Sequence, residues 1–347
     1  MIEIARGHFE GVQYARLPDP GSALLQDLRT CLAKAGCFER SPVAYAVKIT
    51  ALLAMLAAGY AALLSPVSPI VRVALALWMA IGLVQAGFLA HDAMDGAITT
   101  NRRLGAALAQ LLMSLVGGVS STYYDYLHGL HHIAVHRGSK GGGVDPVNPY
   151  ELVWFKRALA NNGLLFAAVT IVLRPVLLQV ESVRYVFRNR ARTKTDRLLM
   201  AVHAIAWFII PLPFIGFVQT VTTYALIALF AGPYIGTILV LNHEGMVSAQ
   251  DDEKDIPAIE RVTRSTRNLG QSWWADLLTG GISNHIEHHL FPEIPAMRLR
   301  KARNITRQFC CDNGIAYTET TFARALIEAA KYFRACPPER LVTEPLS

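Results

Sequence analysis

Long apolar runs, rather than alternating apolar and polar positions, dominate the chain. Four of them reach the length of about 20 residues that a membrane span requires, and they cover residues 45–66, 69–90, 199–219 and 222–242. A helix satisfies all of its backbone hydrogen bonds within one such run, which a membrane interior demands. The pattern therefore predicts an all-α integral membrane protein with four transmembrane helices in two hairpins.

The charges beside these runs predict an orientation. The segments that join each pair, SPVSPI and VQTVTT, carry no charge, whereas the opposite flanks carry Lys48, Arg102, Arg103 and the basic cluster of residues 184–197. Because positively charged flanks remain on the cytosolic side, both joints should face away from the cytosol and both termini should lie inside.

Two further runs, residues 104–121 and 163–180, are less regular. The first contains Gln110 and glycines, and the second carries Arg174 and Pro175 at its middle. We expect both to be interfacial or re-entrant rather than spanning. The expected organisation is an N-terminal cytosolic segment over 1–43, a membrane domain over 44–335 and a C-terminal tail over 336–347.

Composition agrees with a membrane protein. Hydrophobic residues make up 52%, charged residues 17%, and the mean hydropathy is +0.31. A soluble domain carries about 25% charged residues. The net charge of +7 is explained by positive flanks of the spans rather than by nucleic-acid binding. A less favoured use of these cations is contact with anionic lipids or an acidic electron carrier.

Two segments lie outside the spans. The N-terminus is charged and lacks the apolar core of a cleavable signal peptide. The glycine-rich stretch 137–146 lacks the strand and helix that flank a phosphate-binding loop, so we expect a flexible connection there. From residue 293 onward the chain is soluble in character, with two stretches of helical periodicity.

The eleven histidines supply the candidate chemistry, because most of them fall in groups. The motifs HGLHH and HIEHH each place three histidines at i, i+3 and i+4, on one face of a helix. His91 and Asp95 are an i, i+4 pair at the end of the second span. Imidazole binds iron, copper and zinc, and a carboxylate favours iron or zinc over copper. The predicted ligands of a two-metal site are His91, Asp95, His128, His131, His132, His243, His285, His288 and His289.

The remaining three histidines are weaker candidates for metal ligands. His203 lies inside an apolar run and His8 stands alone, so both are expected to be structural. His136 is at most an outer residue of the site. All predicted ligands lie at cytosolic ends of spans or in the loops between them, and they can meet only if 104–121 and 163–180 do not cross the membrane.

With these motifs in hand, the chain resembles the membrane fatty acid desaturases. GGISNHIEHHLFPEIPAMRLRKA looks like the third histidine box of that family, HGLHH like the second and HDAMDGA like the first. TRNLGQSWWADLLTGG and CDNGIAYTETTFARAL are similar to its flanking segments, so the resemblance covers about residues 40–335. It implies a diiron centre of two Fe²⁺ ions on the cytosolic face, with dioxygen as co-substrate.

Two departures from the family pattern concern the site. The first box of the family ends in histidine, where this chain has Asp95, which could ligate iron, orient His91, or leave one iron weakly held. The second box lacks its usual polar companions. We also expect no fused cytochrome-type haem domain, and therefore an external electron donor such as ferredoxin or a cytochrome.

The resemblance implies desaturation of an acyl lipid, an acyl-CoA or an acyl carrier substrate, to give a cis double bond. The basic residues Arg102, Arg103 and Lys140 could meet an anionic head group, although solvated positive flanks explain them equally well. One alternative is a lipid or carotenoid hydroxylase or ketolase of the same superfamily. Another is a non-catalytic metal-binding membrane protein or transporter, for which the few ionisable residues inside the spans provide no continuous path. No nucleic-acid partner is expected.

Overall fold

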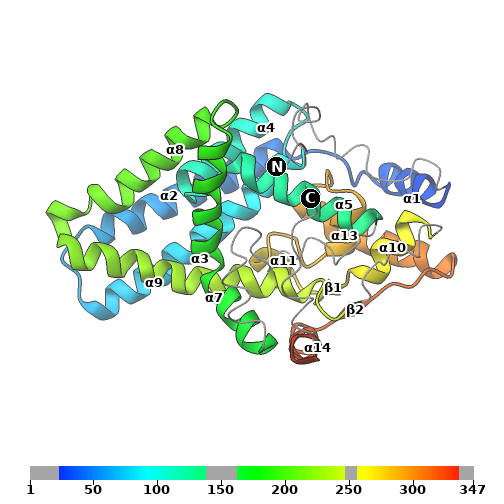
Figure 1. Ribbon diagram of the computed structural model, residues 1–347. Coiled ribbons are helices and arrows are strands. Elements are labelled where there is room, and N and C mark those ends of the chain that lie inside the picture. Colours follow the sequence, from blue (N-terminus) through cyan, green and yellow to red (C-terminus); the bar gives the residue numbers. More distant parts are fainter. Residues whose placement is uncertain (1–22, 138–161, 247–255, 336–347) are drawn as a thin grey trace.

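The computed structural model describes residues 23–137, 162–246 and 256–335, and the side chains of 133–137 are not described. The predicted glycine-rich connection over 137–146, Lys140, His8, and the C-terminal tail over 336–347 fall outside these residues or at their edge. The described chain is mostly helical, as the apolar runs predict, with two strands of two residues each (Figure 1).

The helices and strands follow one another in this order: α1 (Ala23–Lys34), α2 (Pro42–Leu63), α3 (Pro69–Met94), α4 (Arg102–Ala109), the π-helical segment η2 (Gln110–Val116), α5 (Ser121–Arg137), α7 (Gly163–Arg188), α8 (Lys194–Ala204), the π-helical segment η3 (Ile205–Ile209), α9 (Leu212–Leu241), α10 (Ala258–Ser265), β1 (Asn268–Leu269), α11 (Trp273–Leu278), α12 (His285–Leu290), α13 (Ala296–Asp312), β2 (Glu319–Thr320) and α14 (Phe322–Ala335).

Four described helices are long and apolar enough to cross a membrane: α2, α3, α7 and α9. Three of them correspond to predicted spans, with bounds that differ by a few residues, and α9 extends further toward the N-terminus than expected. The fourth, α7, covers the run 163–180 that we expected to be interfacial or re-entrant, and it continues as a helix through Pro175. Length and composition therefore do not by themselves decide which helices cross.

The predicted third span, 199–219, does not form a single regular helix. It is divided among α8, η3 and the start of α9, and the backbone of Gly216 is non-helical with φ 72°. Glycine adopts positive φ without the steric cost that other residues incur. The break therefore lies at Gly216 rather than in the VQTVTT segment, where Thr220 and Thr222 remain helical and donate to the carbonyls of Gly216 and Val218.

The run 104–121 bends sharply. Helix α4 continues into η2, the chain then turns through Gly117 and Gly118, and α5 leaves at 111° to the preceding helix. Such a bend is compatible with a broken span or with a re-entrant segment. It directs α5 toward the region where α3, α9 and α12 end.

Helix α7 crosses the other long helices instead of running along them (Figure 1). It packs directly on α9 at Gly232 and Gly236, where an added Cβ would collide with the main-chain oxygens of Val172 and Ile171. Glycines four residues apart allow two helix backbones to approach closely. This contact fixes α7 beside the part of α9 that leads to the histidines.

The connection between α2 and α3 and the start of α9 lie at one end of the molecule, at the left of Figure 1. At the opposite end, α1, α10, α12 and α13 share an apolar core around residues such as Leu28, Ile286 and Leu299. A second core joins α7, α9 and α14. These two cores form the helical cap into which the histidine motifs fold.

Candidate metal centre

The nine residues that the sequence singled out come together in the structure. His91 lies in the last turn of α3 and Asp95 directly follows that helix, while His243 lies just beyond α9. The other six side chains come from HGLHH on α5 and HIEHH on α12. Because each motif is helical, its three imidazoles lie on one side of their helix, as the i, i+3, i+4 spacing predicts.

Eight of these side chains form two groups of four. In the first group, His91, Asp95, His128 and His288 each place one ligand atom within 4.8 Å of the others. In the second, the same limit holds for His131, His243, His285 and His289. Each group draws on at least three separate segments of the chain, so the complete fold is required to assemble either one.

His132 lies between the two groups. Its Nε2 is 3.1 Å from Nε2 of His288 in the first group, and its ring centroid is 4.4 Å from that of His289 in the second. The two groups are therefore adjacent, and His132 is available to either.

The separations within the groups fit metal coordination. Nε2 of His243 lies 2.7 Å from Nε2 of His285 and 3.1 Å from that of His289, and the latter two atoms are also 3.1 Å apart. Ligand atoms about 2.1 Å from a first-row ion are about 3 Å from one another when they occupy neighbouring coordination positions. Three imidazole nitrogens converging at this spacing, with no charge of their own to hold them together, favour a shared cation.

Asp95 supplies the only carboxylate of the two groups. Its Oδ1 lies 3.2 Å from Nε2 of His128, and its Oδ2 lies 3.4 Å from Nδ1 of His91 and 3.7 Å from Nδ1 of His288. Oδ2 accepts no hydrogen bond within the described part of the chain, although the side chain is only 1% exposed. A buried carboxylate is costly without a compensating positive charge, and a bound cation would provide one.

Four of the imidazoles have lowered pKa values, which favours the neutral form that binds metal. Burial lowers the pKa of His243 to about 4, and burial and the neighbouring histidines lower the pKa values of His285, His288 and His289 well below the usual value. A metal ligand must be deprotonated, so these side chains are ready to bind at neutral pH. The main-chain carbonyl of Ser265, 3.1 Å from Nδ1 of His243, orients that ring.

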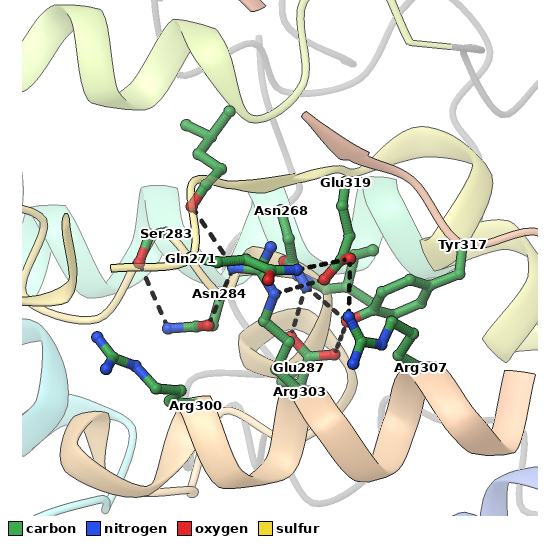
Figure 2. Close-up of polar contacts among 12 residues, drawn as sticks. Asn268, Gln271, Ser283, Asn284, Glu287, Arg300, Arg303, Arg307, Tyr317 and Glu319 are labelled. Carbon is green, nitrogen blue, oxygen red and sulfur yellow. Dashed lines mark hydrogen bonds and ion pairs between the residues drawn. The ribbon is translucent and has the colours of Figure 1, made fainter. Parts of the chain in front are cut away.

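Helix α12 has only six residues, and a polar cluster behind it holds it in place (Figure 2). Glu287 points away from the metal groups and accepts hydrogen bonds of 2.8 Å from Asn268 and 2.7 Å from the hydroxyl of Tyr317. The Asn268 side chain also accepts a 2.9 Å bond from the backbone N–H of Ile286, one of the unpaired donors at the start of the helix. Burial raises the pKa of Glu287, while these two donors lower it.

A second polar contact supports the first group. The hydroxyl of Tyr45 on α2 donates a 2.6 Å hydrogen bond to Asp92 and accepts one of 3.1 Å from the backbone N–H of Ala296. Asp92 is adjacent to His91, and its Oδ1 lies 4.0 Å from Nδ1 of that ring. Tyr45 thereby joins α2, α3 and the start of α13 beside a predicted ligand.

Sequence reasoning did not identify Tyr45, Asp92, Asn268, Glu287 or Tyr317. The two acids stand inside the predicted motifs, but nothing in the sequence pairs them with residues as distant as Tyr45 or Tyr317. The structure places His203 apart from the metal groups, hydrogen-bonded to the Leu115 carbonyl and to Tyr224. Arg102 and Arg103 are exposed at the start of α4.

Comparisons with known proteins agree with this arrangement. The sequence pattern of the family described as fatty acid desaturase matches residues 68–321, which include all nine predicted ligands. An acyl-lipid (9-3)-desaturase of Physcomitrium patens is 26% identical over 336 residues, covering 90% of this chain and 63% of its own length.

Two other relatives are more distant. A Delta 8-(E)-sphingolipid desaturase of Komagataella phaffii is 24% identical and a Delta(6)-fatty-acid desaturase of Caenorhabditis elegans is also 24% identical, each over 69% of this chain. The chain spans 63%, 49% and 59% of the lengths of these three relatives. Because the family pattern extends over most of the sequence and contains every histidine motif, the chain belongs to the fatty acid desaturase family.

Proposed function

We propose that this protein is an oxygen-dependent fatty acyl desaturase whose diiron centre is held by the nine side chains of the candidate metal centre. The observation that carries the proposal is the pair of adjacent four-residue groups, each built from the histidine motifs of distant segments. Two Fe²⁺ ions bound there would supply the activation of dioxygen that removal of hydrogen from an unactivated methylene requires.

The chain contributes the geometry and the environment. Imidazoles bind the ions, Asp95 offsets part of their positive charge, and the clusters around Glu287 and Tyr45 fix the ligand helices. Most of the ligand side chains are buried, which limits the access of water to the reaction. The long apolar helices offer a path for an acyl chain whose two neighbouring carbons would come to lie beside the metal centre.

The substrate is proposed to be an acyl lipid, since one relative is named for acyl lipids and another for sphingolipids. Acyl-CoA and acyl carrier substrates are outcomes that the same experiment distinguishes. An external donor such as ferredoxin or a cytochrome would provide electrons.

Expression in a host of known lipid composition, followed by fatty acid profiling, tests the proposal. We expect a new cis-unsaturated species that depends on oxygen and disappears in the His288→Ala variant. A product that retains label from ¹⁸O₂ would instead indicate the hydroxylase or ketolase reaction. A lipid profile identical to that of the empty host, with iron bound, would favour the non-catalytic alternative.

The proposed topology has four crossing helical segments in two hairpins, α2 with α3 and α8–η3 with α9, and the metal centre on the cytosolic side. Two observations support it. Both hairpin connections lie at the end of the molecule opposite the cap, and the hydroxyl of Tyr60 on α2 donates to the carbonyl of Ala206 in η3, so these segments pack together (Figure 1). Helix α7, which crosses the others, is proposed to lie along the membrane interface.

A further inference from the structure

Helix α7 is apolar on its outer side and polar on its inner side. The exposed positions Leu173, Val176, Val180, Val183 and Phe187 recur at helical spacing and form one apolar stripe. The buried side contains Thr170, Arg174, Glu181 and Ser182. An outer stripe of this kind suits contact with lipid, and ionisable groups turned inward in a membrane protein mark functional sites.

Arg174 stands out among these inward groups. The residue is 7% exposed, and its Nε and Nη1 atoms are buried with no hydrogen-bond partner within the described residues. The hydroxyl of Thr170, one helical turn earlier, is also buried without a partner there. The other two inward groups are engaged, because Tyr123 donates to Glu181 and Ser182 accepts from the backbone N–H of Ser120.

A guanidinium cannot lose its charge in a protein, so Arg174 remains a buried cation. Leaving such a charge unpaired is strongly destabilising. The missing partner is therefore expected to carry a negative charge, and a neutral carbonyl would compensate the arginine only in part. The planar fork of an arginine matches the paired oxygens of a carboxylate or a phosphate.

The position of Arg174 connects it to the metal centre. Tyr124, on α5, stacks on the ring of His128 with centroids 6.0 Å apart. Helix α5 also packs against the inner side of α7, because the hydroxyl of Tyr123 on α5 donates to Glu181. Arg174 lies on this inner side of α7, which meets the helix that carries three predicted metal ligands.

We propose that Arg174, assisted by Thr170, binds an anionic oxygen of the lipid substrate and so sets how far the acyl chain reaches toward the metal centre. The class of ligand is a carboxylate or a phosphate attached to a long acyl chain. This inference rests on the proposed function, since it assigns the polar end of the substrate to α7.

Equilibrium binding to the purified full-length chain in neutral detergent tests the inference without turnover. The probes are two matched pairs with the same acyl chain: palmitate with methyl palmitate, and palmitoyl lysophosphatidate with monopalmitoylglycerol. We expect the anionic member of at least one pair to bind more tightly than its neutral partner. The pair that shows the difference identifies the carboxylate or the phosphate as the ligand.

Substitutions then locate the site. Arg174→Gln should weaken binding of the preferred anionic probe at least about tenfold, because a buried hydrogen bond to a charged group is lost, and should leave the neutral probes nearly unchanged. Arg174→Lys keeps the charge and should restore part of the affinity. The control is Arg184→Gln, which removes an exposed cation from the same helix and should have little effect.

Several results would overturn the inference. They are equal binding of charged and neutral probes by the wild-type chain, equal losses in the Arg174→Gln and Arg184→Gln variants, or a loss that affects the neutral probes as well. If Arg174→Gln does not fold, Thr170→Val and Arg174→Lys provide the comparison, with a smaller loss expected for the anionic probe alone. Selective binding without desaturation would refute the proposed function only, whereas desaturation without selective binding would refute this inference only.

Discussion

Asp95 Oδ1 lies 3.2 Å from Nε2 of His128, which connects the end of α3 to the middle of α5. The other oxygen of the same carboxylate lies 3.4 Å from Nδ1 of His91. One acidic side chain therefore contacts residues from both of the first two histidine motifs. It occupies the position at which the family pattern has a histidine, and its charge distinguishes the first group from the all-histidine second group.

We expect Asp95→Ala to weaken metal binding at the first group by at least about tenfold while the second group remains loaded. The reason is that the substitution removes a carboxylate whose oxygens lie 3.2–3.7 Å from nitrogens of three imidazoles. Titration of the metal-free protein with Fe²⁺ under anaerobic conditions measures both sites. Asp95→His should recover binding if the position is a ligand. Recovery by Asp95→Asn instead would indicate that the side chain only orients its neighbours.

The second group is tested by His243→Ala. Its Nε2 lies 2.7 Å from that of His285, so we expect a lower iron content and loss of the unsaturated product. His203→Ala is the matched control, because His203 is also buried but is bonded to Leu115 and Tyr224. Elemental analysis of both purified variants measures the iron content. Equal iron loss in the two would show that general destabilisation, and not coordination, explains the effect.

Tyr317→Phe tests the support of α12. Removal of the hydroxyl leaves buried Glu287 with one donor fewer, which should cost about 1–3 kcal/mol of folding stability. Because α12 carries three of the predicted ligands, we also expect metal affinity to fall by about 10–100-fold. Thermal unfolding and metal titration measure the two effects. The control is Tyr185→Phe, which removes a phenol hydroxyl from α7 instead. It should change metal binding at neither site.

The depressed pKa values of the cap histidines predict a pH dependence. His243 has a pKa of about 4 in the folded protein, below the value of about 6.5 expected when unfolded. Between these values the unfolded chain binds more protons, so the metal-free protein should lose stability as the pH falls through this window. Thermal unfolding of metal-free and iron-loaded protein at several pH values measures it. The slope should be smaller in His243→Gln, and an unchanged slope would contradict the assignment.

Much of the side-chain arrangement of the candidate metal centre was predictable from the sequence because helical spacing is a local property. HGLHH and HIEHH place their imidazoles on one face of a helix whatever the tertiary packing of that helix. The family resemblance adds the expectation that the two faces meet. The pairing of Asn268 and Tyr317 with Glu287 depends on tertiary contacts between segments up to 49 residues apart, which no local pattern contains.

The spans show a different limit. Apolar runs predicted α2, α3 and most of α9 well, but Gly216 interrupts the third run at a point that hydropathy does not detect. Pro175 suggested an interrupted segment in α7, yet the helix continues through it. Hydropathy also reports only how apolar a helix is, and both a spanning helix and one lying along the interface can satisfy that test.

The orientation of α7 is therefore the most informative test of the topology. Single cysteines at Asn162 and Arg190, at the two ends of α7, should both react with a membrane-impermeant thiol reagent from the cytosolic side if the helix lies along the interface. The exposed native Cys31 and Cys311 of the cap should react from that side too, so all five native cysteines are replaced by serine in this experiment.

Cysteines at Ser65 and Gln219, beside the two proposed hairpin connections, should react only from the opposite side. All four positions are exposed in the structure, so failure to label reports the barrier of the membrane rather than burial in the protein. Labelling of Asn162→Cys and Arg190→Cys from different sides would make α7 a crossing helix. The basic residues that follow α7 and the histidines of α5 would then lie on opposite sides of the bilayer, and the two-hairpin topology would be wrong.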